Sequence, residues 1–164
     1  MVCLPLFPLL QSRNTDIRDD TACGMAALHI HPRATEIFLV VKGRVLTETV
    51  LETGVTAQDS DPTNPLKPRL IKNELTENQA TVFPQGSFHT QMNPECTPGY
   101  AIAAFSSEDP GAALAAPQTF ALTDDFVIAN FGGAVDEAEI QRIRDGIPKG
   151  ALAEVEACKK RCGL

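Results

Sequence analysis

The chain has no tryptophan, a single tyrosine and only 5% aromatic residues in all. A sugar-binding or isomerase site needs aromatic and basic residues around its ligand, so this composition disfavours both classes. Positive charge is also scarce, because 14 lysines and arginines face 21 aspartates and glutamates, which gives a net charge of −7 and a pI near 4.9. Such a chain is a poor match for nucleic acid or for an anionic membrane surface.

Long apolar segments are missing too. No run reaches the length of a transmembrane helix, and no internal repeat or low-complexity tract is present. Residues 2–10 are apolar, but two prolines interrupt them and no basic residue precedes them, so a signal peptide is not evident. The length of 164 residues predicts one domain with a sizeable core.

Histidine is rare, and its placement is informative. All three histidines lie in two short segments, HIHPRATE with His29, His31 and Glu36, and FPQGSFHTQMN with His89. Strand side chains alternate, so His29 and His31 point to one face, and Pro32 favours a turn that returns Glu36 beside them. Such a histidine pair can also be an ordinary core or solvated pair. The full set of three imidazoles and one carboxylate instead favours a catalytic metal site with positions left for water.

The two segments resemble the paired motifs of the cupins. The first motif is represented by Gly24, His29, His31, Glu36 and Gly43, with its leading glycine one residue closer to the first histidine than usual. The second motif, Pro-x-Gly-x-x-His-x-x-x-Asn, runs from Pro84 to Asn93, and Asn78 stands where its preceding glycine is usual. HIHPRATE and SSEDPG are most similar to the germin-like branch. FPQG, NPEC and ACKKRCGL are similar to its fungal and spherulin-type members.

This resemblance implies an all-β fold, a cupin jelly-roll barrel with an α-helical carboxy-terminal appendage. We expect a single domain over residues 1–164, divided into an amino-terminal arm at 1–19, the barrel at 20–125 and a helical segment at 126–164. The pattern predicts strands near residues 22–31, 36–42, 44–52, 69–73, 80–84, 87–92 and 99–106. It predicts an extended or irregular segment at 118–131, and helices at 134–147 and 151–162.

Three polar residues are candidates for the cavity around the metal. Gln91 lies two residues from His89 on the same strand face, so we expect it to line this cavity. Arg33 could steer a substrate anion or pin the turn of the first motif, and Asn93 could line the cavity or cap the turn after its strand. For both we favour the structural role. Residues expected in the barrel core, some of them as a dry wall around the metal, are Phe38, Val40, Phe83 and Phe105.

The five cysteines are an odd number. In the cupin layout His29 and His89 lie on antiparallel strands, and if they are opposite each other, Cys23 and Cys96 fall at the same end of the ladder. This predicts a disulfide between Cys23 and Cys96, with two buried thiols as the alternative. Cys158 and Cys162 are one helical turn apart, and either a bridge between them or one to Cys3 stays open.

The resemblance also implies one divalent ion. Manganese is expected from the family, while zinc, copper, iron and nickel stay open because imidazole ligands accept all of them. The favoured function is a manganese-dependent oxidoreductase of the superoxide dismutase type. Oxalate oxidase or decarboxylase is less favoured, because oxalate oxidases carry Asn-Pro-Pro where this chain has Ala26, Ala27 and Leu28. A further alternative is a non-enzymatic, secreted metal-binding or structural protein, similar to a spherulin with a role in stress or encystment.

Partners and location follow from the same resemblance. We expect an extracellular protein that acts on a small molecule or on none; a homo-oligomer is one possible state, and the oligomeric state stays open. Neither nucleic acid nor a membrane is an expected partner.

Overall fold

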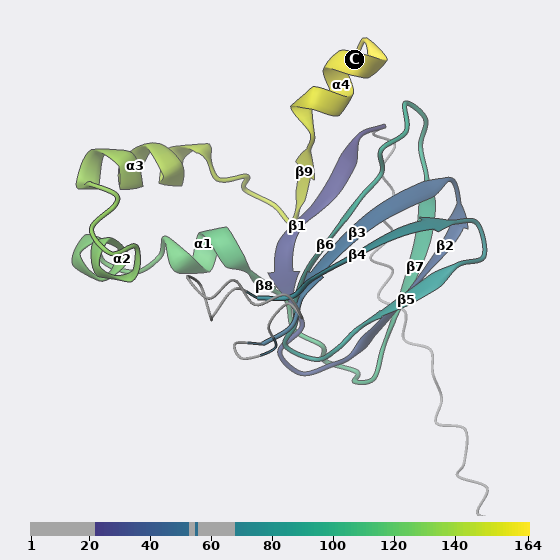
Figure 1. Cartoon of the computed structure of the whole chain (residues 1–164), viewed down its shortest axis with the longest axis horizontal. Coiled ribbons are helices and arrows are strands. Elements are labelled where there is room, and N and C mark those ends of the chain that lie inside the picture. Colours follow the sequence, from purple (N-terminus) through teal and green to yellow (C-terminus); the bar gives the residue numbers. More distant parts are fainter. Residues whose placement is uncertain (1–21, 53–54, 56–67) are drawn as a thin grey trace, which may run out of the picture.

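A computed structural model describes residues 22–52, 55 and 68–164 of the chain. Most strands come first and the helices follow. The helices α1, α2 and α3 gather beside the strands, and α4 lies away from these three helices at the end of β9 (Figure 1). The expected arm at residues 1–19 lies outside the described residues. In the part of the chain that the structure describes, no helix is long and apolar enough to span a membrane.

The first seven strands lie close to their predicted positions, whereas the short β8 and β9 were not predicted. The strands are β1 Gly24–Ile30, β2 Glu36–Lys42, β3 Arg44–Val50, β4 Leu70–Thr76, β5 Ala80–Phe83, β6 Phe88–Met92, β7 Tyr100–Phe105, β8 Ala113–Leu114 and β9 Leu152–Glu154. The helices are α1 Ala115–Thr119, α2 Asp124–Asn130, α3 Glu137–Gly146 and α4 Glu156–Cys162.

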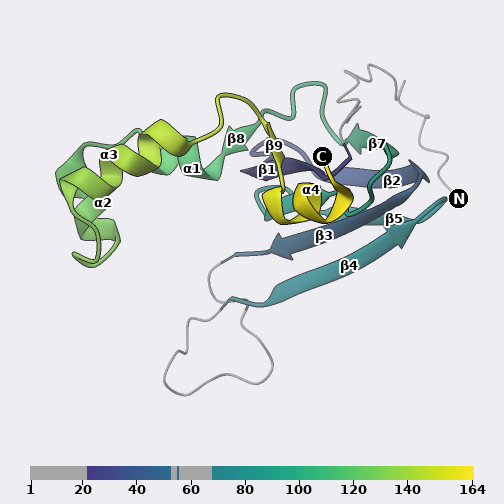
Figure 2. The ribbon, with the colours of Figure 1, turned by 90° about the horizontal axis from the view of Figure 1, so that it is seen from above.

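Two antiparallel sheets build the cupin fold. The larger sheet has the order β4-β3-β6-β1-β8, and β9 also pairs with β1; the smaller sheet has the order β5-β2-β7. β8 and β9 share one edge of β1, since β8 pairs with its end at His29 and β9 with its start at Gly24. Figure 2 shows β3 and β4 on one side of the molecule and the helices α1–α3 projecting to the other.

The alternation of β2 explains the core. Glu36, Phe38 and Val40 are buried, whereas the intervening Ile37 and Leu39 are exposed, as a period of two requires. Phe38 and Val40 pack into a cluster of buried apolar residues that also contains Val45, Leu75, Phe83 and Ala101. The core prediction is therefore confirmed for Phe38, Val40 and Phe83.

Two expectations for the carboxy-terminal half are wrong. Residues 118–131 are largely helical rather than irregular, because α1 and α2 are too short to show a helical period in the sequence. Acidic Asp124 and Asp125 in the first turn of α2 favour the helix through its dipole. The helix expected from residue 151 begins at Glu156 instead, since residues 152–154 pair with the free edge of β1 as β9.

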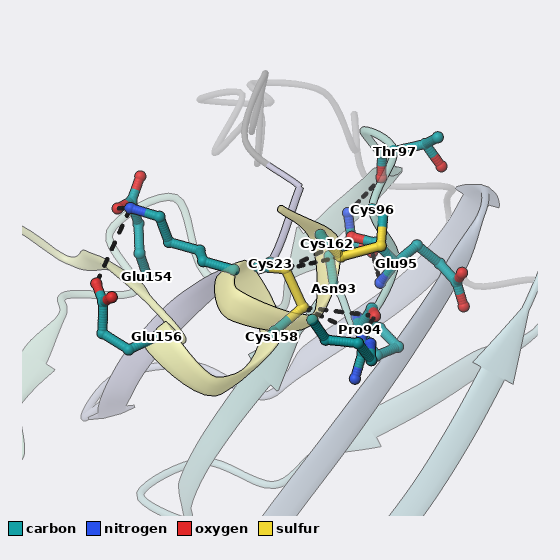
Figure 3. The surroundings of a disulfide bond; sticks show 12 residues. Cys23, Asn93, Pro94, Glu95, Cys96, Thr97, Glu154, Glu156, Cys158 and Cys162 are labelled. Atoms are coloured by element: carbon teal, nitrogen blue, oxygen red, sulfur yellow. Dashed lines mark hydrogen bonds and ion pairs between the residues drawn. A yellow bond between two sulfur atoms is a disulfide. The ribbon is translucent and has the colours of Figure 1, made fainter. Parts of the chain in front are cut away.

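The cysteine pairing also differs from the prediction. The disulfides join Cys23 to Cys158 and Cys96 to Cys162, with Cα–Cα distances of 5.5 and 5.3 Å (Figure 3). The expected register is present, because His29 lies opposite His89 and the Cys23 amide donates to the Glu95 carbonyl at 3.1 Å. However, α4 packs against this end of the ladder, and its two cysteines take one partner each. Cys3 lies outside the described residues.

Removal of one disulfide tests how much the attachment of α4 contributes to the stability of the fold. We expect Cys158→Ser to lower the free energy of unfolding by about 2–5 kcal/mol, because the Cys23–Cys158 bridge closes a loop of 135 residues. Denaturant unfolding followed by circular dichroism measures the change, with Cys3→Ser as the control that touches neither bridge. Peptide mapping without reduction that finds Cys23 linked to Cys96 would contradict the assignment.

Candidate metal centre

Four predicted ligands meet inside the barrel at the end of β1. His29 belongs to β1, His31 follows it, Glu36 begins β2 and His89 lies on β6. Their donor atoms all lie within 4.8 Å of one another. The His31 and His89 Nε2 atoms are 3.0 and 3.3 Å from the same Glu36 oxygen. His31, Glu36 and His89 are buried and His29 is half-buried, so the cluster is most accessible beside His29.

Backbone carbonyls orient all three imidazoles in the same way. The Nδ1 atoms of His29, His31 and His89 donate to the carbonyls of Ala27, Gly111 and Ser87, at 2.7, 2.6 and 2.9 Å. A carbonyl can only accept, so each Nδ1 carries a proton and each Nε2 is left for a metal, which would replace the protons that His31 and His89 share with Glu36. Such anchoring is characteristic of metal-binding histidines, because it holds both the tautomer and the ring orientation.

The electrostatics of the cluster favour a cation. Burial opposes the charge on Glu36, but hydrogen bonds from His31 and His89 outweigh it and lower the pKa of Glu36 to about 2. Burial and the nearby His89 lower the pKa of His29 to about 4. Burial also opposes a charge on His31, yet its hydrogen bonds to Glu36 and Gly111 raise the pKa of His31 above its usual value. At neutral pH the cluster therefore combines an ionised carboxylate with neutral His29.

The donor set fits a divalent metal ion. Donors bound to one ion at about 2.2 Å lie no more than about 4.4 Å apart, so a contraction of a few tenths of an ångström closes this cluster. Imidazole and carboxylate ligands suit manganese, iron, zinc, copper and nickel, and the donor set alone does not choose between them. The residues that would hold the ion are His29, His31, Glu36 and His89.

Aromatic rings form a dry wall on one side of the cluster. Phe83 stacks on His89 with ring centroids 4.3 Å apart, and Phe105 meets the His31 ring at 4.7 Å. Both contacts agree with the expectation that some core phenylalanines surround the site.

Two of the three cavity candidates border a small cavity that lies away from the four ligands. Gln91 and Asn93 line this cavity of about 20 Å³ together with Gly24 and Gly99, and none of the four ligands borders it; it has room for one water molecule. Gln91 is 3% exposed, and its Oε1 has no hydrogen-bond partner among the described residues. Asn93 also stabilises the turn after β6, since it accepts from the Glu95 amide and donates to the Thr97 carbonyl. A larger hollow of about 370 Å³ lies beside α1 and the end of α3, and none of the four ligands borders it.

Arg33, the third candidate, lies outside the cavity. Its side chain is 54% exposed, and its Nη2 pairs with Asp109 at 2.7 Å while its Nε donates to the Asp109 carbonyl. The backbone amide of Arg33 donates to Pro110. These contacts pin the first-motif turn to the segment after β7, which is the structural alternative considered for this residue.

Gly111 is a positioning residue that the sequence did not identify. Its carbonyl accepts from His31, and its φ of +65° lies in the left-handed region. A Cβ atom here would lie 2.8 Å from the Arg33 Nη2 and 3.0 Å from Pro32. The only local signal is the Pro-Gly pair in SSEDPG, which predicts a turn but not a contact with a histidine 80 residues earlier.

Gly111→Ala should therefore weaken metal binding by about 10–100-fold, the usual effect of losing a residue that orients a ligand. The matched control is Gly132→Ala, which has a similar φ of +62° but open space around the added Cβ. Isothermal titration of both variants with Mn²⁺ measures the affinity. Equal losses in the two variants would show that Gly111 does not position His31.

Comparison with known proteins agrees with this geometry. The cupin family profile matches residues 7–139. Spherulin-1A of Physarum polycephalum is 34% identical over 146 residues, which cover 87% of this chain and 52% of that protein. Germin-like protein subfamily 2 member 3 of Arabidopsis thaliana is 31% identical over 129 residues, which cover 76% of this chain and 52% of that protein. The chain thus spans about half the length of these relatives.

A solved oxalate oxidase has the same fold. It is 25% identical with a TM-score of 0.61, and the match covers 77% of this chain and 58% of the oxidase. These likenesses agree with the motifs around His29 and His89. The chain belongs to the cupin family and, within it, to the germin-like proteins, with the spherulins among its relatives.

Proposed function

We propose that this protein is a manganese-dependent oxidoreductase of the superoxide dismutase type. The observation that carries the proposal is the cluster of His29, His31 and His89 with Glu36, whose donor atoms lie within 4.8 Å of one another while the three Nδ1 atoms are held by backbone carbonyls. A bound manganese ion would supply a one-electron redox couple and open coordination positions. The choice of manganese comes from the germin resemblance.

The limited access to the site supports a very small substrate. Phe83 and Phe105 pack against the cluster, and His31, Glu36 and His89 are buried, so the cluster is accessible mainly beside His29. Superoxide needs no larger binding pocket. A small anion would enter beside His29, the most exposed of the four ligands.

Gln91 supplies a polar group that such chemistry needs. It shares the inward face of β6 with His89, and its buried Oε1 has no partner among the described residues. A buried acceptor without a partner is costly, so a hydrogen-bond donor in the cavity is favoured. We infer that Gln91 orients a water molecule or the substrate on the inward face of β6 that it shares with His89.

Two other functions are weaker candidates. Oxalate turnover lacks a polar anchor, because Ala26 lies opposite Gln91 in the β1–β6 ladder and offers only a methyl group to that face. A metal-binding protein without turnover would have the same ligands and no catalysis. The disulfides and the spherulin and germin relatives support an extracellular location for any of the three.

Dismutase activity should depend on Glu36. We expect Glu36→Gln to lose most of its bound manganese and most of its activity, because the ionised carboxylate is the only negative ligand. Glu74→Gln is the control, since it makes the same change at an exposed carboxylate that pairs with Arg44 at 2.8 Å. Elemental analysis and superoxide decay measure the two quantities. If the unmodified protein is fully occupied by manganese but has no dismutase activity, this result would support the non-enzymatic alternative.

Oxalate turnover should be low in the natural chain and higher in Ala26→Asn. An unpaired polar group of the substrate costs about 1–3 kcal/mol in a closed cavity, and asparagine at position 26 would supply a donor beside Gln91. Peroxide release from oxalate by manganese-loaded protein measures the effect. Rapid release by the unmodified protein would overturn the preference for superoxide.

A further inference from the structure

Four cysteines from three distant segments meet at the opposite end of β1. Cys23 precedes β1, Cys96 lies between β6 and β7, and Cys158 and Cys162 belong to α4 (Figure 3). The two disulfides touch, because the Sγ atoms of Cys23 and Cys162, which belong to different bridges, are 3.7 Å apart. Cys23 and His29 are separated by about 20 Å along the strand, so this cysteine cluster is distinct from the candidate metal centre.

We propose that the cysteine cluster, once its two disulfides are reduced, binds one zinc ion through four thiolates. In the oxidised chain two covalent bridges hold α4 against the barrel, and in the reduced chain the zinc ion would make the same attachment. The proposal does not depend on the function of the His/Glu cluster.

The positions of the sulfur atoms fit a tetrahedral site. Four sulfurs bound to zinc at about 2.3 Å lie about 3.8 Å apart, and Cys23 and Cys162 already have nearly this separation. The sulfurs of Cys23, Cys158 and Cys162 all lie within 4.8 Å of one another, and the Cys96 sulfur is bonded to that of Cys162. After reduction the bonded sulfurs would have to move apart by side-chain rotation, and Cys96 would have to turn toward the other three.

The spacing on α4 fits as well. Cys158 and Cys162 are separated by three residues, within the range of two to four that is common between paired zinc ligands. Residues four apart share one helix face, so both thiols point to the barrel together. Cys96 and Cys23 come from the facing loop and strand, which gives ligands on both sides of the ion.

Burial and charge favour a closed, structural site. Cys23 and Cys158 are 0% and 2% exposed and Cys162 is half-buried, so three of the four sulfurs are shielded from water, while Cys96 lies at the exposed rim of the site. Zinc with four thiolates carries a net charge of −2, and the Arg161 guanidinium donates to the Cys158 sulfur at 3.3 Å. The same guanidinium donates to the Pro94 carbonyl, which holds it in place beside the sulfur. Basic groups near the sulfur favour the thiolate form that zinc requires.

The conversion is balanced with a dithiol as the reductant. Each disulfide takes up two electrons and two protons, its S–S bond breaks to give two thiols, and the dithiol is oxidised to its own disulfide. Zinc then replaces the four thiol protons, which pass to water. Exchange with a disulfide oxidant, which is reduced to its dithiol, takes the electrons back, re-forms both bridges and releases the ion.

Cobalt substitution tests the proposal with the full chain. We would use Cys3→Ser protein so that only the four cluster thiols remain, reduce it with a phosphine, remove the phosphine and titrate with Co²⁺. We expect a sulfur-to-cobalt charge-transfer band that saturates at about one ion per chain and disappears on addition of one equivalent of Zn²⁺. The oxidised form of the same protein is the matched control, because it keeps the His/Glu cluster but has no thiolates and should give no such band.

A ligand variant and a measurement of folding test whether the cysteine cluster binds zinc as a structural site. Cys162→Ser in the same background should lower zinc affinity by at least about tenfold, since loss of a direct ligand exceeds the usual effect of an outer-shell residue. If reduction alone unfolds the chain, recovery of the native circular dichroism with one equivalent of zinc supports the proposal. Absence of the band, a band without native circular dichroism, or unchanged affinity in Cys162→Ser would overturn it.

Discussion

The pairing of β1 with β6 is the contact on which both ends of this molecule depend. It places His29 opposite His89 near one end and brings the Cys23 amide to Glu95 at the other. Residues opposite each other in an antiparallel ladder share a face at about 5 Å, which is the spacing that two ligands of one ion need. A slip of one residue would turn His89 away from the barrel interior and separate the ligands. The register is supported from the other side by β3, where Thr49 lies opposite His89.

The polar cluster is stable inside the barrel because its members satisfy one another. An isolated buried carboxylate would be costly, but Glu36 has two imidazole partners, and each imidazole has a backbone carbonyl. The apolar core around Phe38 supplies the burial that the cluster cannot. The apolar core therefore stabilises the barrel, and the surrounding strands hold the four donor atoms close together.

The carboxy-terminal half contributes strands to the barrel and is bonded to it. β8 and β9 occupy the free edge of β1, and the two disulfides attach α4 to the loop after β6 and to the start of β1. Gly111, just before β8, supplies the carbonyl that orients His31. The geometry of the candidate metal centre is therefore determined partly by residues some 80 positions away from its first ligands.

Much of the barrel and the whole His/Glu cluster could be predicted from the sequence alone, because those signals are local. Alternation with a period of two located β2 and β3, and the two motifs identified His29, His31, Glu36 and His89. Even the irregular Asn78 is consistent with its motif, since its φ of 65° is a conformation that glycine and asparagine accept.

Local patterns could not determine contacts between distant segments. Only the tertiary structure decided that Arg33 pairs with Asp109, that residues 152–154 add a strand to β1, and that α4 comes between Cys23 and Cys96. Each of these choices depends on which surface a third segment packs against, and that information is not present in the spacing of any two residues.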